Sequence, residues 1–304
     1  MKKCLFAVFG CFVLLFLTVV YVYGDTVFVA GADTNVVEEY SGGTGNVFGA
    51  VNASSVSFLT LAANKFVYAS SSSGDIFRFY NGGESTVFAK RLNNPRGLVA
   101  TNNCLYVADN NGQIFEINSL GEKTLFATTP TGYLQGLAYN NGYLYAASTS
   151  NVIYKVSLSS GTVSVFATNT LFNDGHLYWP ASLLGPLGIA FDSSNNLYVA
   201  NNSSDYITKF NSLGQPIADV QLDSGSPRGL AIAGNTLYVT STGPSGHGII
   251  YDYNVNDFQY SIPFADTGSY QPYGIVAQVP EMSVWIFVVI GICFSFGLNK
   301  LFSH

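Results

Sequence analysis

The sequence predicts an all-β fold, a six-bladed β-propeller, and two observations support this prediction. A short hydrophobic block recurs six times, and each copy is followed by alternating segments bounded by Gly, Asn and Ser. No helical periodicity of useful length appears between residues 25 and 278. Four short strands in a unit of about 40 residues are typical of a propeller blade, so the repeat predicts the architecture.

The recurring block is expected to form the second strand of each blade. Its copies are Val27–Ala30, Phe66–Ala69, Leu105–Ala108, Leu144–Ala147, Leu197–Ala200 and Leu237–Thr240. Their last positions are separated by 39, 39, 39, 53 and 40 residues. Three identical steps indicate one structural unit that is repeated along the chain.

The other three strands of each blade follow from the segments around the block. Alternating segments such as Gln113–Ile117 and Tyr206–Phe210 predict the third strand, and Thr124–Ala127 predicts a fourth. An anchor at a small turn predicts the innermost strand, at Pro95–Leu98, Leu134–Leu137, Pro186–Ile189, Pro227–Leu230 and Pro272–Ile275.

The two ends of residues 25–278 are expected to complete one blade. Pro272–Ile275 has no strands after it, whereas Val27–Ala30 and its partner Val36–Tyr40 have no anchor before them. Pairing these segments closes the ring and removes the exposed edge of an open sheet. We therefore predict six blades, one of them shared between the two ends.

The charge of the body excludes some classes of partner. Between residues 25 and 281, nine Lys and Arg residues stand against eighteen Asp and Glu residues, with no basic stripe. This balance argues against nucleic acid and against anionic membrane surfaces. Cys104 is the single cysteine of the body, so no disulfide framework is expected, and the body is predicted to be a monomer.

Residues 1–24 read as a secretory signal. Lys2 and Lys3 precede an apolar run from Cys4 to Tyr23, and Gly24 supplies a small residue for cleavage. An uncleaved anchor is the alternative, because ~18 apolar residues are enough to span a bilayer.

The anchor and the block resemble the NHL-repeat family of propellers across residues 25–278. The best copy runs from Gly185 to Asn201 and continues to Phe210. The resemblance implies that an Asp after the block contacts a neighbouring loop. That Asp stands at Asp109, and the other copies have Gly31, Ser70, Ser148, Asn201 and Ser241.

Two irregular loops on one face of the ring supply the first candidate site. The step of 53 residues inserts about 13 residues near Asn169–Pro180, and blade six carries the long loop Ser241–Gly248. The candidate ligand-binding residues in these loops are Asp174, His176, Trp179 and His247. The alternative is that the aromatic residues pin a long loop and that both His residues are solvated. The metal is unknown, because the spacing is not that of a zinc motif.

Arg96 and Arg228 form the second candidate site. Each precedes an anchor Gly, three blades apart, so the two are expected to lie opposite each other at the channel mouth. They are suited to hold a carboxylate or a sulfate with two hydrogen bonds. The alternative is that they cap inner strands and pair with a nearby Asp or Glu.

Residues 279–304 lie beyond the last predicted strand and are interpreted as a targeting segment. A short apolar run follows Val279, Pro280 and Glu281, and Lys300 stands near its end. This order resembles the PEP-CTERM sorting signal of Gram-negative bacteria. It implies an exosortase-type processing enzyme, transient anchoring by a transmembrane helix, and a final place at the cell surface or outside the cell. A plain membrane anchor is the alternative.

These observations predict an exported bacterial propeller that works as a binding module for polysaccharide or protein in the cell envelope, rather than as an enzyme. The alternative is a secreted metal-dependent lyase or lactonase with its site at the top of the channel. No cofactor is predicted: the Asn, Asp and Ser loops suit weak Ca²⁺ contacts but are also ordinary turns.

Overall fold

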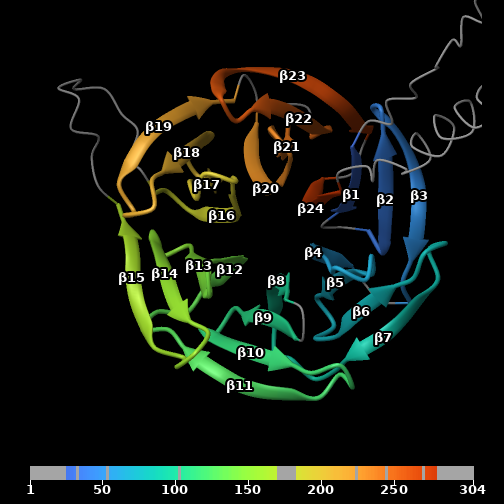
Figure 1. Ribbon diagram of the computed structural model, residues 1–304. Coiled ribbons are helices and arrows are strands. Elements are labelled where there is room, and N and C mark those ends of the chain that lie inside the picture. The colour runs from blue at the N-terminus through green and yellow to red at the C-terminus, as the bar shows by residue number, and fades with distance from the viewer. Residues whose placement is uncertain are drawn as a thin grey trace, which may run out of the picture.

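The fold is described from a computed structural model of the chain. It describes residues 25–31, 34–52, 55–101, 104–169, 183–222, 225–243, 246–268 and 271–278, with the backbone alone at 259–262. These residues form 24 strands in six antiparallel four-stranded sheets. Figure 1 shows these sheets arranged as blades around a common axis. The predicted all-β, six-bladed propeller is therefore confirmed.

Four layers of strands run from the channel outward in each blade. The innermost strands are β24 (Pro272–Gln278), β4 (Val56–Leu61), β8 (Pro95–Ala100), β12 (Leu134–Asn140), β16 (Pro186–Phe191) and β20 (Ser226–Ala233). The second strands are β1 (Thr26–Gly31), β5 (Val67–Ser71), β9 (Leu105–Asp109), β13 (Tyr143–Ser148), β17 (Leu197–Asn201) and β21 (Thr236–Thr242). The third strands are β2 (Val36–Ser41), β6 (Ile76–Phe79), β10 (Gln113–Ile117), β14 (Val152–Ser157), β18 (Tyr206–Phe210) and β22 (Gly248–Asn254). The outermost strands are β3 (Thr44–Ala50), β7 (Ser85–Ala89), β11 (Lys123–Thr128), β15 (Val163–Thr168), β19 (Pro216–Gln221) and β23 (Asp257–Gly268).

Blade 1 closes the ring from both ends of the described chain, as the sequence predicts. Strand β24 pairs antiparallel with β1, so that Val29 lies opposite Ile275. The sheet continues through β2 to β3. The first and last strands thus share one sheet, and β1 has a paired strand on each of its two edges.

Blade 2 departs from the predicted repeat. Its second strand, Val67–Ser71, begins one residue later than the block Phe66–Ala69 that the sequence indicated. The pairing shows the shift: Val67 lies opposite Phe79 in blade 2, as Leu105 lies opposite Ile117 in blade 3. Its inner strand, Val56–Leu61, has no Pro-x-Gly anchor and was missed. The predicted spacing of 39 residues between equivalent positions of neighbouring blades is therefore wrong on both sides of blade 2.

The anchor Gly of each inner strand is required by the backbone of the next blade. A Cβ added to Gly188 would lie 2.3 Å from the carbonyl oxygen of Arg228, and one added to Gly136 would lie 2.2 Å from that of Leu187. The same approach repeats at Gly97, Gly229 and Gly274. Five inner strands can pack this closely only because their anchor residue has no side chain. In blade 2 the corresponding residue is Phe58, which is buried.

The hydrophobic core lies between neighbouring blades, and an aromatic pair recurs inside the blades. The second strand presents Phe28 or a Tyr, which meets a Phe of the outermost strand edge to face. The pairs are Phe28–Phe48, Tyr68–Phe88, Tyr106–Phe126, Tyr145–Phe166 and Tyr238–Phe264, with ring centroids 4.8 to 5.1 Å apart. Blade 5 has no such Phe, and Tyr198 meets Phe258 of blade 6 instead.

No helix in the described part of the chain has the length and apolar content to cross a membrane. The predicted signal helix at 1–24 and transmembrane helix at 279–304 lie outside the described residues.

Candidate functional site

The candidate site is the mouth of the central channel, where each inner strand begins. The residue before the anchor position differs between the blades, except that blades 3 and 6 both have an Arg there. In ring order these residues are Ser57, Arg96, Gln135, Leu187, Arg228 and Tyr273. Below them, the anchor positions and the residues that follow surround a channel cavity of only about 40 Å³. This cavity is far smaller than the ~300–1,000 Å³ usual for ligand pockets, so the mouth above it is the candidate for ligand binding at this end.

Arg228, Tyr273 and Phe58 form a stacked series across blades 6, 1 and 2. The guanidinium carbon of Arg228 lies 5.2 Å from the ring centroid of Tyr273. The Tyr273 ring meets Phe58 edge to face, with centroids 5.0 Å apart. Arg228 also donates from Nη2 to Oε1 of Gln271, at 3.0 Å. These contacts fix the position of one guanidinium at the mouth.

Arg96 and Arg228 both carry hydrogen-bonding capacity that the protein does not use. The Nε atoms of both side chains are buried and have no hydrogen-bond partner among the described residues. Within the same part of the chain, neither forms an ion pair with an Asp or Glu, whereas Lys209 does so with Asp192, at 3.7 Å. The sequence alternative, in which both Arg residues pair with nearby carboxylates, is not seen in these residues.

The electrostatics of Tyr273 connect the two guanidinium groups. Burial raises the pKa of Tyr273, and the positive charges of Arg96 and Arg228 act in the opposite direction. One hydroxyl therefore lies within the electrostatic reach of both cations, although they come from blades 3 and 6. The mouth thus combines two positive charges, a phenol hydroxyl and the amide of Gln271. This set of groups can receive an anion.

The loop contact that the family resemblance implied at Asp109 is present. Its two carboxylate oxygens accept hydrogen bonds from the backbone N–H groups of Asn93 and Asn94, at 2.9 and 3.1 Å. Asn201 makes a related contact, because its Oδ1 accepts from the backbone N–H of Leu184 at 3.0 Å. These bonds tie the loop that enters an inner strand to the end of the second strand, and so hold the rim of the mouth.

The first candidate site can be described only at His247. Its side chain is exposed, and its carbonyl oxygen accepts a hydrogen bond from the N–H of Gly243 at 2.7 Å. Asp174, His176 and Trp179 lie outside the described residues, so their convergence with His247 stays a prediction. The described residues contain no group of three or more His, Cys, Asp and Glu side chains that could hold a metal ion.

Sequence reasoning found both Arg residues but missed Tyr273, Phe58 and Gln271. Tyr273 occupies the same anchor position as Arg96 and Arg228, so a comparison of this position across the copies would have found it. Phe58 carries no such signal, because the inner strand of blade 2 lacks the Pro and the Gly that mark the others.

Comparisons with known proteins bear on the fold. No family model matches the chain, and no curated protein matches it. A solved structure of a nidogen/laminin complex matches with a TM-score of 0.69 and 18% identity, over 84% of this chain and 98% of the other. Virginiamycin B lyase from Staphylococcus aureus matches with a TM-score of 0.61 and 18% identity, over 83% of this chain and 87% of the other.

A protein from Bacteroides caccae matches with a TM-score of 0.62 and 12% identity, over 84% of this chain and 98% of the other. These likenesses decide the architecture. The chain is a six-bladed β-propeller. At this level of identity they show the fold alone, and propellers of this fold both bind partners and catalyse reactions.

Proposed function

We propose that this propeller is an exported binding module that recognises an anionic group, a carboxylate or a sulfate, at the channel mouth. One observation carries the proposal: Arg96 and Arg228 both have a buried Nε without a hydrogen-bond partner among the described residues, and neither forms an ion pair with a carboxylate there. The positive charges of both also act on Tyr273, which lies at the same mouth. A buried guanidinium N–H without an acceptor carries an unrecovered desolvation cost, which a hydrogen bond to an anionic ligand would offset. The propeller in the nidogen/laminin complex gives general support, since its fold occurs in a protein that binds another protein.

The net charge of the body restricts the kind of anionic partner. The body is acidic by nine between residues 25 and 281, so long-range forces repel a polyanion and favour a partner with one or a few anionic groups. Two sources in the cell envelope share this chemistry: a uronic acid unit of a polysaccharide and an Asp or Glu side chain of a protein.

Binding titrations test this proposal. The full-length protein, purified in a neutral detergent, would be titrated with the methyl glycoside of galacturonic acid and with an acetylated Glu-containing tripeptide, each of which carries few anionic groups. At least one is expected to bind, and Arg96→Gln or Arg228→Gln should each weaken binding about tenfold, as expected for a lost charge-assisted hydrogen bond. Lys123→Gln, at an exposed Lys outside the mouth, is the matched control. Equal affinity of the Arg variants and the parent protein would overturn the proposal.

The alternative function, a secreted lyase or lactonase, is supported by the likeness to virginiamycin B lyase and by His247 at the rim. The test is activity rather than binding. Cleavage of a cyclic depsipeptide or a lactone that is lost in both His176→Ala and His247→Ala would support the enzyme. Cleavage that survives both changes would contradict a mechanism that uses them.

We infer the location of the protein from the two ends of the sequence. The signal-like residues 1–24 and the tail that begins Val279-Pro280-Glu281 together favour export and sorting by an exosortase-type enzyme. Mass spectrometry of the protein from its native host should show a first residue near Asp25 and a last residue near Glu281. An intact tail that ends in His304 would contradict sorting and leave a plain anchor.

A further inference from the structure

A second groove lies between blades 1 and 2 on the face opposite the channel mouth. Thr26 pairs with Gln278 at the end of β24, and Tyr273 stands near the start of the same strand. The groove has a volume of about 300 Å³ and is lined by Thr26, Glu39, Asn81 and Gln278 together with the rings of Phe28 and Phe48. This volume is at the lower end of the ~300–1,000 Å³ that is usual for ligand pockets.

Glu39 is the unusual residue of this groove. In every blade, the third strand places a charged residue opposite the aromatic residue of the second strand: Glu39, Arg78, Glu116, Lys155, Lys209 and Asp252. The groups in blades 2 to 5 are engaged within the protein. The cations of Arg78, Lys155 and Lys209 stack on aromatic rings. Glu116 accepts hydrogen bonds from Cys104 at 3.0 Å and from Tyr106 at 3.3 Å.

In blade 1 the facing residue is Phe28, which has no hydroxyl to donate. Among the described residues, the side chain of Glu39 forms no hydrogen bond and no ion pair, although it is half-buried. A half-buried carboxylate has lost part of its hydration, and here no hydrogen bond or ion pair of the described residues compensates for that loss. It is therefore prepared to accept hydrogen bonds from a molecule in the groove.

The other groups of the groove indicate which molecule this is. Asn81 and Gln278 offer amide donors and acceptors, and Thr26 offers a hydroxyl. The half-buried Phe48 gives the groove an apolar wall, and the buried Phe28 meets it edge to face at 4.8 Å. Lys65 also lines the groove, so its lining contains one acidic and one basic side chain. We propose that this groove binds a neutral saccharide, with the Glu39 carboxylate accepting from vicinal hydroxyl groups and the C–H face of the sugar ring packed on the phenylalanine wall.

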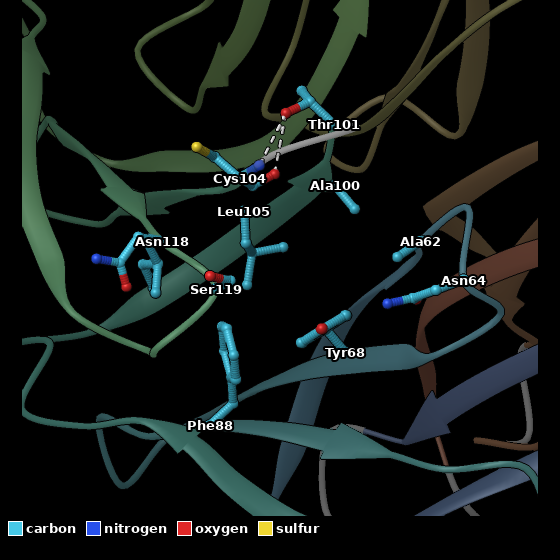
Figure 2. A pocket seen from close by; sticks show the side chains of 11 residues that line it. Ala62, Asn64, Tyr68, Phe88, Ala100, Thr101, Cys104, Leu105, Asn118 and Ser119 are labelled. Carbon is cyan, nitrogen blue, oxygen red and sulfur yellow. Dashed lines mark hydrogen bonds between the residues drawn. The ribbon is translucent and has the colours of Figure 1, made fainter.

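The equivalent groove between blades 2 and 3 lacks this combination (Figure 2). Its volume is about 140 Å³, and its lining includes Tyr68, Phe88 and Cys104 but no carboxylate. There Thr101 and Cys104 are hydrogen-bonded to each other across the turn that joins β8 to β9. The proposed site is therefore a property of blade 1 and not of the repeat.

A saccharide panel tests the site. Methyl glycosides of glucose, galactose and mannose, and N-acetylglucosamine, would be titrated into the full-length protein in a neutral detergent and followed by saturation-transfer NMR. At least one is expected to bind, and Glu39→Gln should weaken its binding at least about tenfold, because the charge of the acceptor is lost. Phe28→Tyr should also weaken binding, since it supplies Glu39 with the hydroxyl that Tyr106 supplies to Glu116.

Two controls separate this site from the channel mouth and from a loss of folding. Glu116→Gln, the same change at the equivalent position of blade 3, should leave saccharide affinity unchanged. Arg96→Gln with Arg228→Gln should abolish anion binding at the mouth and leave saccharide binding intact, so each site can fail without the other. Each variant would be accepted after its thermal unfolding midpoint was measured. The absence of binding by the parent protein, or binding that Glu39→Gln does not weaken, would overturn the proposal.

Discussion

The anchor glycines of five inner strands show that the absence of a Cβ atom allows neighbouring blades to pack closely around the ring. Each of them lies against a carbonyl of the next blade at a distance that excludes a Cβ. Phe58 breaks this rule in blade 2, and its ring lies against Tyr273 at the channel mouth. A departure from the repeat and the candidate site thus coincide, as is common where function overrides a local rule.

The first prediction concerns Gly188→Ala. The added methyl group would overlap the carbonyl of Arg228, so the free energy of unfolding should fall by about 1–3 kcal/mol, the usual cost of overpacking. Thermal unfolding followed by circular dichroism measures the change. Gly132→Ala is the control, because its Cβ would have no neighbour closer than 3.4 Å. Equal unfolding midpoints for the two variants would show that the blades do not pack as closely as described.

The second prediction concerns Asp109, which is buried and accepts two backbone hydrogen bonds. Asp109→Ala leaves the N–H groups of Asn93 and Asn94 without their acceptor, and the free energy of unfolding should fall by about 3 kcal/mol. Asp109→Asn keeps one acceptor oxygen, so its loss should be smaller. Denaturant unfolding measures both variants, and an order reversed between them would contradict the role assigned to the carboxylate.

At the scale of strands, the aromatic pair between the second and the outermost strand recurs in five of the six blades. Tyr145 meets Phe166 at 5.0 Å within blade 4 and also meets Phe191 of blade 5 at 4.6 Å. Such contacts stabilise by about 0.5–1.5 kcal/mol beyond simple burial. They join layers of one blade and neighbouring blades through the same side chain.

The third prediction concerns the pair of strands β9 and β10, beside which Cys104 donates to Glu116. Burial, and then the hydrogen bond and charge of Glu116, raise the pKa of Cys104 to about 11. Alkylation of Cys104, followed by peptide mapping, should therefore stay slow until the pH approaches that value. Glu116→Gln should lower the pH at which the reaction accelerates, because the carboxylate charge opposes thiolate formation.

The sign of the effect on stability follows from the same shift. A thiol is neutral below its pKa, and folding favours the neutral form here, so this stabilisation is complete below the ordinary thiol pKa of about 8.5. It is lost as the pH rises from there through about 11. A Cys104→Ser variant should show less of this decline in stability. An equal decline would assign the pH dependence to other groups.

At the scale of the whole molecule, closure by β24 and β1 is what turns six sheets into one ring. Our fourth prediction compares two truncations. A chain that ends at Gln278 keeps every strand and should unfold in one cooperative transition. A chain that ends at Gln271 lacks β24, exposes the inner edge of β1 and should lose that transition. Cooperative unfolding of the shorter chain would contradict closure by these strands.

The repeat allowed most of the fold to be predicted, because alternation and spacing are set by local strand chemistry. Blade 2 was predicted less well. Its inner strand, Val56–Leu61, has no turn signal, and its second strand begins one residue later than predicted. At the site, Arg96 and Arg228 were predicted from their anchor positions. The roles of Tyr273 and Phe58 were not, because a contact between blades 1 and 2 depends on ring closure and not on any local pattern. Glu39 was not predicted for a similar reason. Its side chain lacks the tyrosine hydroxyl that Glu116 has in blade 3, and only the strand pairing shows that the two positions are equivalent.

The measurement that tests the central claim most directly is a double-mutant cycle on Arg96 and Arg228, with the anionic probe that binds most tightly to the parent protein. If both guanidinium groups hold one anion, each single Gln variant should weaken binding about tenfold, and the double variant should show a coupling of at least ~0.5 kcal/mol between the two sites. A double variant that binds the anion as tightly as the parent protein would contradict anion recognition at the channel mouth.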